Sequence, residues 1–144
     1  MIKNDIQQAI NSALKERRET ALKVLRFVMS QIKYGEIDKQ KDLTDEEIVS
    51  LMQKEIKKRK EAIEMFKKGR RTDLVKDEEA QITVIQKFLP QQLTSEELEK
   101  IVNDTISETA DKNMGKIIGL AMGKVKGKAD GSAVSSLVRQ KLQQ

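Results

Sequence analysis

The sequence contains the stretch Leu43-Thr44-Asp45-Glu46-Glu47-Ile48. Thr44 stands three residues before Glu47, which is the spacing of a capping box, where a hydroxyl and a carboxylate each accept a backbone N–H at a helix start. Leu43 and Ile48 flank this pair at the positions of a hydrophobic staple. The stretch therefore predicts that a helix begins directly after Thr44.

A second capping box follows the only proline, Pro90, in the stretch Leu93-Thr94-Ser95-Glu96-Glu97-Leu98. It predicts another helix start and a boundary in the chain near residues 90–94. Between the two boxes, Gly69 is a predicted helix stop and Thr72 the predicted N-cap of the next helix. Two helices, over about 45–68 and 73–88, are expected to form a hairpin.

The remaining sequence also shows helical periodicity, and no stretch alternates as a strand does. The predicted core stripes of the first hairpin are Ile6, Ala9, Ile10, Ala13 and Leu14, then Leu22, Leu25, Val28, Met29 and Ile32. After Pro90 we expect helices over 95–109, 114–125 and 131–142, with Asp130 as the N-cap of the last. The sequence thus predicts an all-α protein in two parts, about four helices over residues 1–92 and three over 93–144.

The residues that are absent exclude several kinds of chemistry. The chain has no Cys and no His, so disulfides, thiolate zinc sites, cysteine nucleophiles and imidazole bases or ligands are excluded. We therefore expect no metal and no cofactor. Lys3, Asn4 and Asp5 interrupt any apolar run at the N-terminus, and no stretch approaches the ~18 apolar residues of a membrane span. No membrane partner and a cytoplasmic location are expected.

Positive charge is concentrated in two segments. Residues 54–71 hold nine basic and three acidic residues, and residues 112–141 hold seven basic residues and one acid. The helix between them, within 94–111, has six acids and one base. This pattern favours a polyanionic partner, and Lys57 and Lys58 are candidate contacts. The alternative is that the lysines of 54–71 only solvate a helix face. Glu55 and Arg59 are spaced as an ion pair at the core edge.

Five of the seven glycines stand at every fourth position, at 115, 119, 123, 127 and 131. Each glycine inside a helix costs about 1 kcal/mol relative to alanine, which indicates a close approach by another backbone. Either this helix packs tightly on the last one, or a phosphate backbone approaches it. The cationic turn at 123–131 is equally consistent with phosphate binding and with a purely structural role. With one Tyr and three Phe, base stacking is disfavoured, so a nucleic acid would be recognised by backbone and shape.

Several motifs in order resemble those of the YqeY-like family, and the resemblance covers nearly the whole chain. They are Gln53-Lys54-Glu55-Ile56-Lys57-Lys58-Arg59-Lys60-Glu61, Gly69-Arg70-Arg71-Thr72-Asp73-Leu74, Phe88-Leu89-Pro90-Gln91-Gln92-Leu93, Met114-Gly115-Lys116 and Val125-Lys126-Gly127-Lys128-Ala129-Asp130-Gly131. The family tends to have proline where this chain has Gly123. It is related to the C-terminal tail domain of one subunit of the aspartyl/glutamyl-tRNA amidotransferase, and similar domains are appended to some glutaminyl-tRNA synthetases.

The resemblance implies a two-part helical fold and association with tRNA, while the chemistry happens elsewhere. By this analogy the expected phosphate contacts are Lys116, Lys124, Lys126, Gly127, Lys128 and Gly131. The family label of carbon–nitrogen ligase with glutamine as amido donor belongs to the whole amidotransferase, and this chain shows no nucleotide or amidase motif for that reaction.

Three functional hypotheses follow. The first is a non-catalytic tRNA-binding accessory module. The second is a protein-interaction module that docks on an amidotransferase or an aminoacyl-tRNA synthetase. The third is a free-standing amide-transferring enzyme, which would form product from glutamine by itself.

Overall fold

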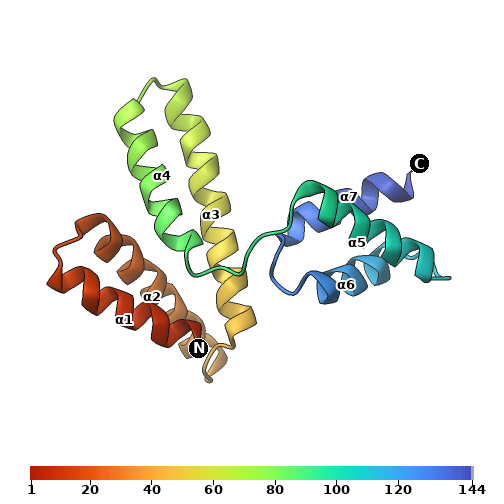
Figure 1. The fold of residues 1–144 in the computed structure, drawn as a ribbon, viewed down its shortest axis with the longest axis horizontal. Coiled ribbons are helices and arrows are strands. Elements are labelled where there is room, and N and C mark those ends of the chain that lie inside the picture. The colour runs from red at the N-terminus through yellow and green to blue at the C-terminus, as the bar shows by residue number, and fades with distance from the viewer. Residues whose placement is uncertain (144) are drawn as a thin grey trace. The chain divides into compact units, whose positions relative to one another are not determined.

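A computed structural model describes residues 1–143, and they form seven helices (Figure 1). The helices are α1 (Ile2–Lys15), α2 (Glu19–Lys39), α3 (Asp45–Lys68), α4 (Thr72–Gln86), α5 (Ser95–Glu108), α6 (Met114–Val125) and α7 (Gly131–Leu142). No residue from 1 to 143 lies in a strand, and the all-α prediction is confirmed. The chain divides into two compact units, and the division falls between Leu89 and Pro90. Separate domains over 1–92 and 93–144 stay a prediction.

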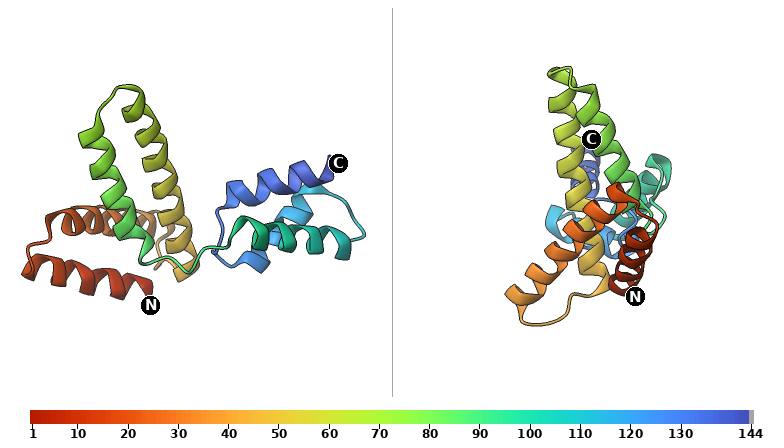
Figure 2. Two further views of the ribbon diagram at one scale, coloured as in Figure 1. Left: turned by 45° about the horizontal axis from the view of Figure 1, so that its top comes forward. Right: turned by 90° about the vertical axis from the view of Figure 1, so that its left-hand side faces the viewer.

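The first unit consists of two antiparallel hairpins, α1–α2 and α3–α4, whose connecting turns point in different directions (Figures 1 and 2). Helix α2 packs on α1 and on α4, and α3 packs chiefly on α4. The core is aliphatic, and its largest fully buried side chains are Ile6, Val24, Val28, Ile32, Ile48, Met52 and Ile85. Of the stripe predicted in α1, only Leu14 is clearly misplaced, because 55% of it is exposed at the end of the helix.

The second unit is formed by α5, α6 and α7, each of which packs on the other two. Its core is built mainly from valines, and the fully buried side chains are Val102, Ile117, Ala121, Val125, Val134 and Val138. The predicted bounds of α6 and α7 agree with the structure, and α5 ends one residue earlier than predicted, at Glu108.

Both predicted capping boxes are confirmed. At α3 the Thr44 hydroxyl accepts the Glu47 N–H at 3.2 Å, and the Glu47 carboxylate accepts the Thr44 N–H at 3.1 Å. At α5 the corresponding distances between Thr94 and Glu97 are 3.1 and 3.0 Å. Each box satisfies backbone groups that a helix start leaves unpaired.

The turn between α3 and α4 differs from the prediction in two ways. Gly69 does end α3, but the residue with left-handed geometry is Arg70, at φ 57°. The N–H of Arg71 donates to the carbonyl of Phe66 at 2.9 Å, closing a Schellman motif. The prediction that Thr72 caps α4 is wrong, because this tight turn places Arg71 at the N-cap and Thr72 inside the helix.

Arg59 joins three helices of the first unit. Its guanidinium donates to Glu55 at 3.0 Å, as the sequence predicts, and also to Glu78 at 3.1 Å and Gln81 at 2.6 Å on α4. The same group lies 5.5 Å from the centre of the Phe27 ring on α2. These further contacts could not be predicted, because those to α4 depend on how α3 pairs with α4 and the one to α2 depends on how the two hairpins meet.

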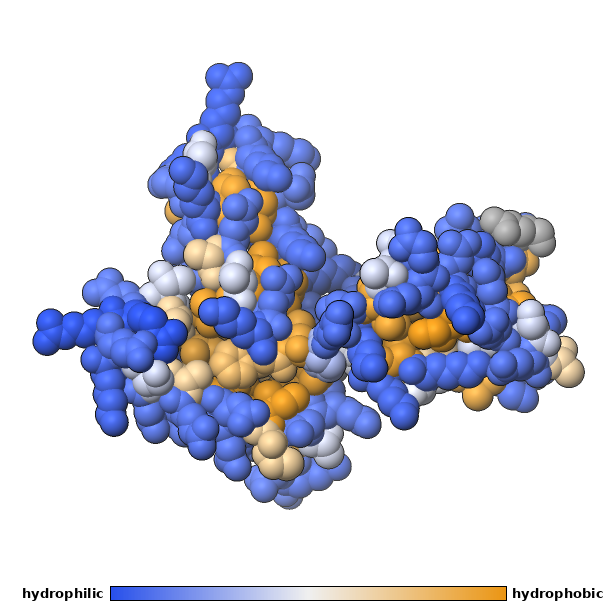
Figure 3. Space-filling model, viewed as in Figure 1, coloured by the Kyte–Doolittle hydropathy of each residue, from blue (hydrophilic) through white to orange (hydrophobic). Residues whose placement is uncertain are grey.

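The surface is mostly hydrophilic, and hydrophobic residues show mainly along the seams between helices (Figure 3). Although α3 runs for 24 residues, neither it nor another helix within residues 1–143 has the apolar stretch needed to cross a bilayer.

The capping box of α3 predicts how stability depends on pH. Hydrogen bonds from the Lys39 ammonium and then from the Thr44 N–H lower the pKa of Glu47 from 4.5 to about 2. Glu47 therefore stabilises the fold above pH 4.5, and this contribution is lost as the pH falls from 4.5 towards 2. Glu47→Gln keeps an oxygen for the Thr44 N–H but carries no charge, so its unfolding free energy should fall less over that interval. Urea midpoints measured across it check this; parallel curves for the two proteins would contradict it.

Substitution of Arg59 tests the ion pairs that its guanidinium forms within the α3–α4 hairpin. Arg59→Met should lower the free energy of unfolding by about 3 kcal/mol, because it leaves two largely buried carboxylates, those of Glu55 and Glu78, without their cation. Adding Glu55→Gln and Glu78→Gln should restore part of the loss. The exposed neighbour Lys58→Met is the control and should change stability by less than about 0.5 kcal/mol. Equal losses of stability in Arg59→Met and Lys58→Met would refute the structural role of Arg59.

Candidate nucleic-acid interface

Helix α6 buries one side and leaves its glycines on the other. Ile117, Ala121 and Val125 are fully buried, whereas Gly115, Gly119 and Gly123 are exposed. A Cβ atom added to Gly119 or Gly123 would have nothing within 4 Å, and one added to Gly115 would meet only the Asn113 side chain, at 3.4 Å. Tight packing of these glycines against the last helix, one of the two predicted explanations, is therefore wrong. The glycine row is an open strip of backbone.

The turn after α6 requires unusual backbone geometry. Lys126 and Gly127 are both left-handed, with φ of 50° and 79°. The Lys128 N–H donates to the Val125 carbonyl at 2.9 Å, and the Lys128 carbonyl accepts the Leu93 N–H at 2.8 Å. The Gln92 amide donates to the Gly127 carbonyl at 3.3 Å. Residues far apart in the sequence therefore hold this turn in place, which no local pattern reveals.

The predicted lysines differ in their surroundings. Lys124 pairs with Glu108 at 2.9 Å, and Lys116 lies 3.7 Å from Asp111. Lys126 and Lys128 are exposed and form no ion pair within the part of the chain that the structure describes. Since α5 packs beside α6, its acidic end partly neutralises the charge of α6. The unopposed positive charge lies on the turn.

Gly131 begins α7, and Asp130 holds the N-cap position as predicted. The Asp130 carboxylate makes no capping bond but accepts the hydroxyl of Ser132. Its negative charge stands where a phosphate would meet the N–H groups of α7. A phosphate near Gly131 would therefore be held by the lysines of the turn more than by this helix end.

The other two candidates, Lys57 and Lys58, are exposed on α3 in the first unit. The sequence-predicted residues thus form one local group in the second unit, at 116–131, and one separate pair.

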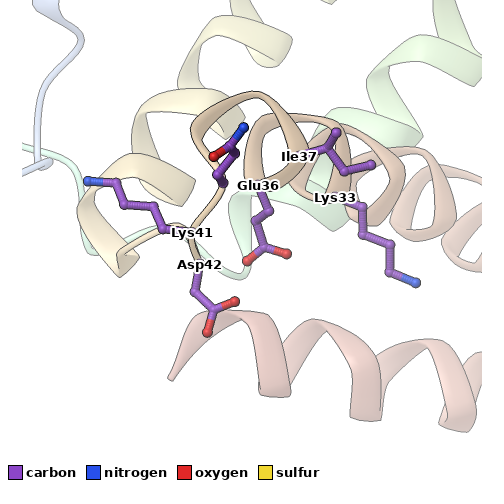
Figure 4. Close-up of a pocket in the computed structure, with 6 residues that line it drawn as sticks. Lys33, Glu36, Ile37, Lys41 and Asp42 are labelled. Carbon is purple, nitrogen blue, oxygen red and sulfur yellow. The ribbon is translucent and has the colours of Figure 1, made fainter.

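A hollow in the first unit is lined by Lys33, Glu36, Ile37, Gln40, Lys41 and Asp42, none of which was a predicted site residue. Glu36 and Asp42 point towards the same side, and Lys33 and Lys41 extend away from each other (Figure 4). Glu36 is bonded to Lys3 at 2.7 Å and accepts the Leu43 N–H at 3.1 Å. The hydrogen bond from Lys3, and to a smaller extent the one from the Leu43 N–H, lowers the pKa of Glu36. The Glu36 carboxylate thus connects α2 with Lys3 of α1 and with the backbone just before α3.

Comparison with known proteins identifies a family that matches nearly the whole chain and relatives that match about three fifths to two thirds of it. A family model described as Yqey-like protein matches residues 3–142. An uncharacterized protein of Schizosaccharomyces pombe is 35% identical over 86 residues, which cover 60% of this chain and 70% of that protein. The protein named altered inheritance of mitochondria protein 41, mitochondrial, of Lachancea thermotolerans is 37% identical over 99 residues, 68% of this chain and 51% of its own length.

A protein of the same name from Pyrenophora tritici-repentis is 31% identical over 83 residues, 58% of this chain and 46% of its length. The matches thus span about half the length of these two fungal proteins. The names of both place those proteins in mitochondria.

The open glycine row predicts an unusual response to substitution. Gly119→Ala and Gly123→Ala should each raise the free energy of unfolding by about 0.5–1 kcal/mol, because alanine favours the helix and meets no neighbour. Gly127→Ala is the contrasting control: its left-handed φ of 79° should make it destabilising. Chemical denaturation of the three variants checks this, and a loss of stability at position 119 or 123 would show that the row packs on something.

Proposed function

Because this chain belongs to the YqeY-like family, we propose that it is an accessory protein that binds the phosphate backbone of tRNA and leaves the chemistry to another enzyme. The proposal draws on the relationship of the family to the tail domain of the tRNA-dependent amidotransferase. On this chain the binding surface consists of the glycine row of α6 and the turn at 124–128.

The observation that carries the proposal is the open glycine row. Three glycines in one helix lower its stability, and neither Gly119 nor Gly123 has a neighbour in the fold that needs the space. Their cost is explained if a partner backbone approaches α6 closely. Lys126 and Lys128 then stand at the end of the row and carry the charge that attracts phosphate.

The composition of this surface fits backbone binding better than base recognition. The 12 residues of α6 include no aromatic side chain on which a base could stack. Helical RNA presents phosphates and ribose hydroxyls along its minor groove, which are recognised by shape. Since tRNA occurs in cytoplasm and in mitochondria, the proposal fits the predicted cytoplasmic location and also the locations in the names of the two fungal proteins.

The first test measures binding of tRNA by fluorescence anisotropy in about 50 and about 200 mM salt. If Lys126 and Lys128 neutralise two phosphates, the affinity should fall on the order of 10-fold between these conditions. Lys126→Ala with Lys128→Ala should weaken binding at low salt about 10-fold. The matched control, Lys100→Ala with Arg139→Ala, removes the same charge from other helices and should have a smaller effect.

A second pair of variants tests the glycine row itself. Gly119→Leu with Gly123→Leu adds bulk at positions where a Cβ atom would have nothing within 4 Å. It should weaken tRNA binding about 10-fold, whereas the corresponding alanine pair should have less effect. No binding by the native protein at low salt would refute the proposal. Equal losses from the turn variant and its charge-matched control would reduce it to general electrostatic attraction.

A further inference from the structure

Helix α2 has a second, exposed face. Its inner face is buried against α1 and α4 through residues such as Val24, Val28 and Ile32. On the outer side three large side chains are exposed to solvent: Phe27 by 40%, Tyr34 by 65% and Ile37 by 71%. Single exposed apolar residues are ordinary, but these three lie on one face of one helix.

The spacing of this outer face matches the seam of a two-helix contact. Its residues are Lys23, Phe27, Ser30, Tyr34 and Ile37, at alternating steps of four and three. Steps of four and three give the 3.5-residue repeat that keeps one face of a helix against a partner helix. Ser30 stands at the centre, and its hydroxyl already donates to the Phe27 carbonyl at 2.6 Å. It can be covered without losing a hydrogen bond.

The edge of this seam is positively charged. Arg26 and Lys33 are both exposed, lie one heptad apart and flank the same side of the seam. The acids nearest the seam are Glu36, which is held on another side by Lys3 and the Leu43 N–H, and Asp38, which is exposed at the opposite edge of the seam. A partner that lies along the edge of Arg26 and Lys33 therefore meets two cations, while Asp38 lies across the seam from them.

One end of the seam is fixed in place by the core. The Arg59 guanidinium lies 5.5 Å from the centre of the Phe27 ring, and Glu55 and Gln81 hold it there. Phe27 is thereby ordered before any partner arrives, which lowers the entropy lost on binding.

We propose that the outer face of α2 is a docking site for an amphipathic helix of a partner protein. The partner helix has aliphatic residues at the seam and acidic residues along the edge that faces Arg26 and Lys33. The aliphatic residues cover Phe27, Tyr34 and Ile37, while the acids pair with the two cations. This site lies in the first unit and is independent of the proposed tRNA contacts in the second.

Other occupants fit the face less well. RNA offers phosphates to the two cations. Phosphates laid over three apolar side chains, however, would lose hydrating water and gain no hydrogen bond there. A second copy of the chain, packed antiparallel, would bring its own Arg26 and Lys33 to the same edge, where like charges repel. A parallel copy would set Lys33 beside Asp38 of the other chain but would set Arg26 beside the uncharged Gln31, so it meets only one of the two cations with an acid. An acidic amphipathic helix satisfies both the apolar seam and the charged edge.

The experiment uses the full chain and two labelled synthetic helices of about 21 residues, with leucine at the seam positions of each heptad. One probe has glutamate along its edges, and the other has lysine. By fluorescence anisotropy the acidic probe should bind at least about 10-fold more tightly than the basic one. Arg26→Glu with Lys33→Glu should reverse this preference.

A matched pair of variants distinguishes binding at the seam from non-specific hydrophobic binding. Tyr34→Ser with Ile37→Ser should weaken acidic-probe binding at least about 10-fold. Leu14→Ser with Met65→Ser removes two other exposed apolar residues, 55% and 66% exposed, and should leave binding unchanged. Circular dichroism melting confirms that all variants fold.

Three results would overturn the proposal. One is equal binding of the acidic and basic probes, and another is equal loss in the two serine variants. The third is that Tyr34→Ser with Ile37→Ser changes a different property instead: the mass in solution, which would indicate a dimer, or binding to phosphatidylserine vesicles or tRNA. Loss of tRNA binding in the Lys126 and Lys128 variant bears only on the tRNA proposal.

Discussion

Each helix in this protein is held by the burial of one aliphatic face, and the rest of the structure depends on that constraint. Aromatic residues make up 3% of the chain, so the cores are built from Ile, Val, Leu and Met. These side chains stabilise the fold by packing closely between the helices. Packing between two helices buries a stripe of about three residues in every two turns of each helix. The residues outside that stripe do not contact the core, so packing does not explain which residue types stand there.

Two faces stand out once packing is accounted for. On α6 the face away from the core has glycines with open space above them, which weakens the helix without improving the fold. On α2 the face away from the core has Tyr34 and Ile37 largely exposed to water, which weakens solubility without improving the fold. The loss of helix stability on α6 and of solubility on α2 is not offset by any contact inside the unit, which argues for a partner molecule at each face. The chemistry of each face indicates a different kind of partner.

The features that could be predicted from the sequence are the ones whose causes are local. Capping boxes at Thr44 and Thr94 act within four residues, and the amphipathic period follows from helix geometry, so the helices and most of the core follow from the sequence. The end of α3 is less local, because the left-handed position falls on Arg70 while the glycine stands beside it. Contacts between distant segments, such as Leu93 with Lys128, have no pattern in the sequence. For the same reason the glycine row could be noticed but not explained before its surroundings were known.

The two proposed surfaces should respond in opposite ways to salt, and this follows from what each one buries. Phosphate binding at Lys126 and Lys128 releases counterions from the RNA, so its affinity falls steeply as salt rises. At the α2 face the apolar seam supplies most of the binding free energy and the Arg26 and Lys33 edge supplies orientation, so added salt screens only the smaller part. A partner enzyme that docks through α2 would therefore remain bound at salt concentrations that release tRNA. One chain could in this way stay attached to an enzyme while it takes up and releases RNA.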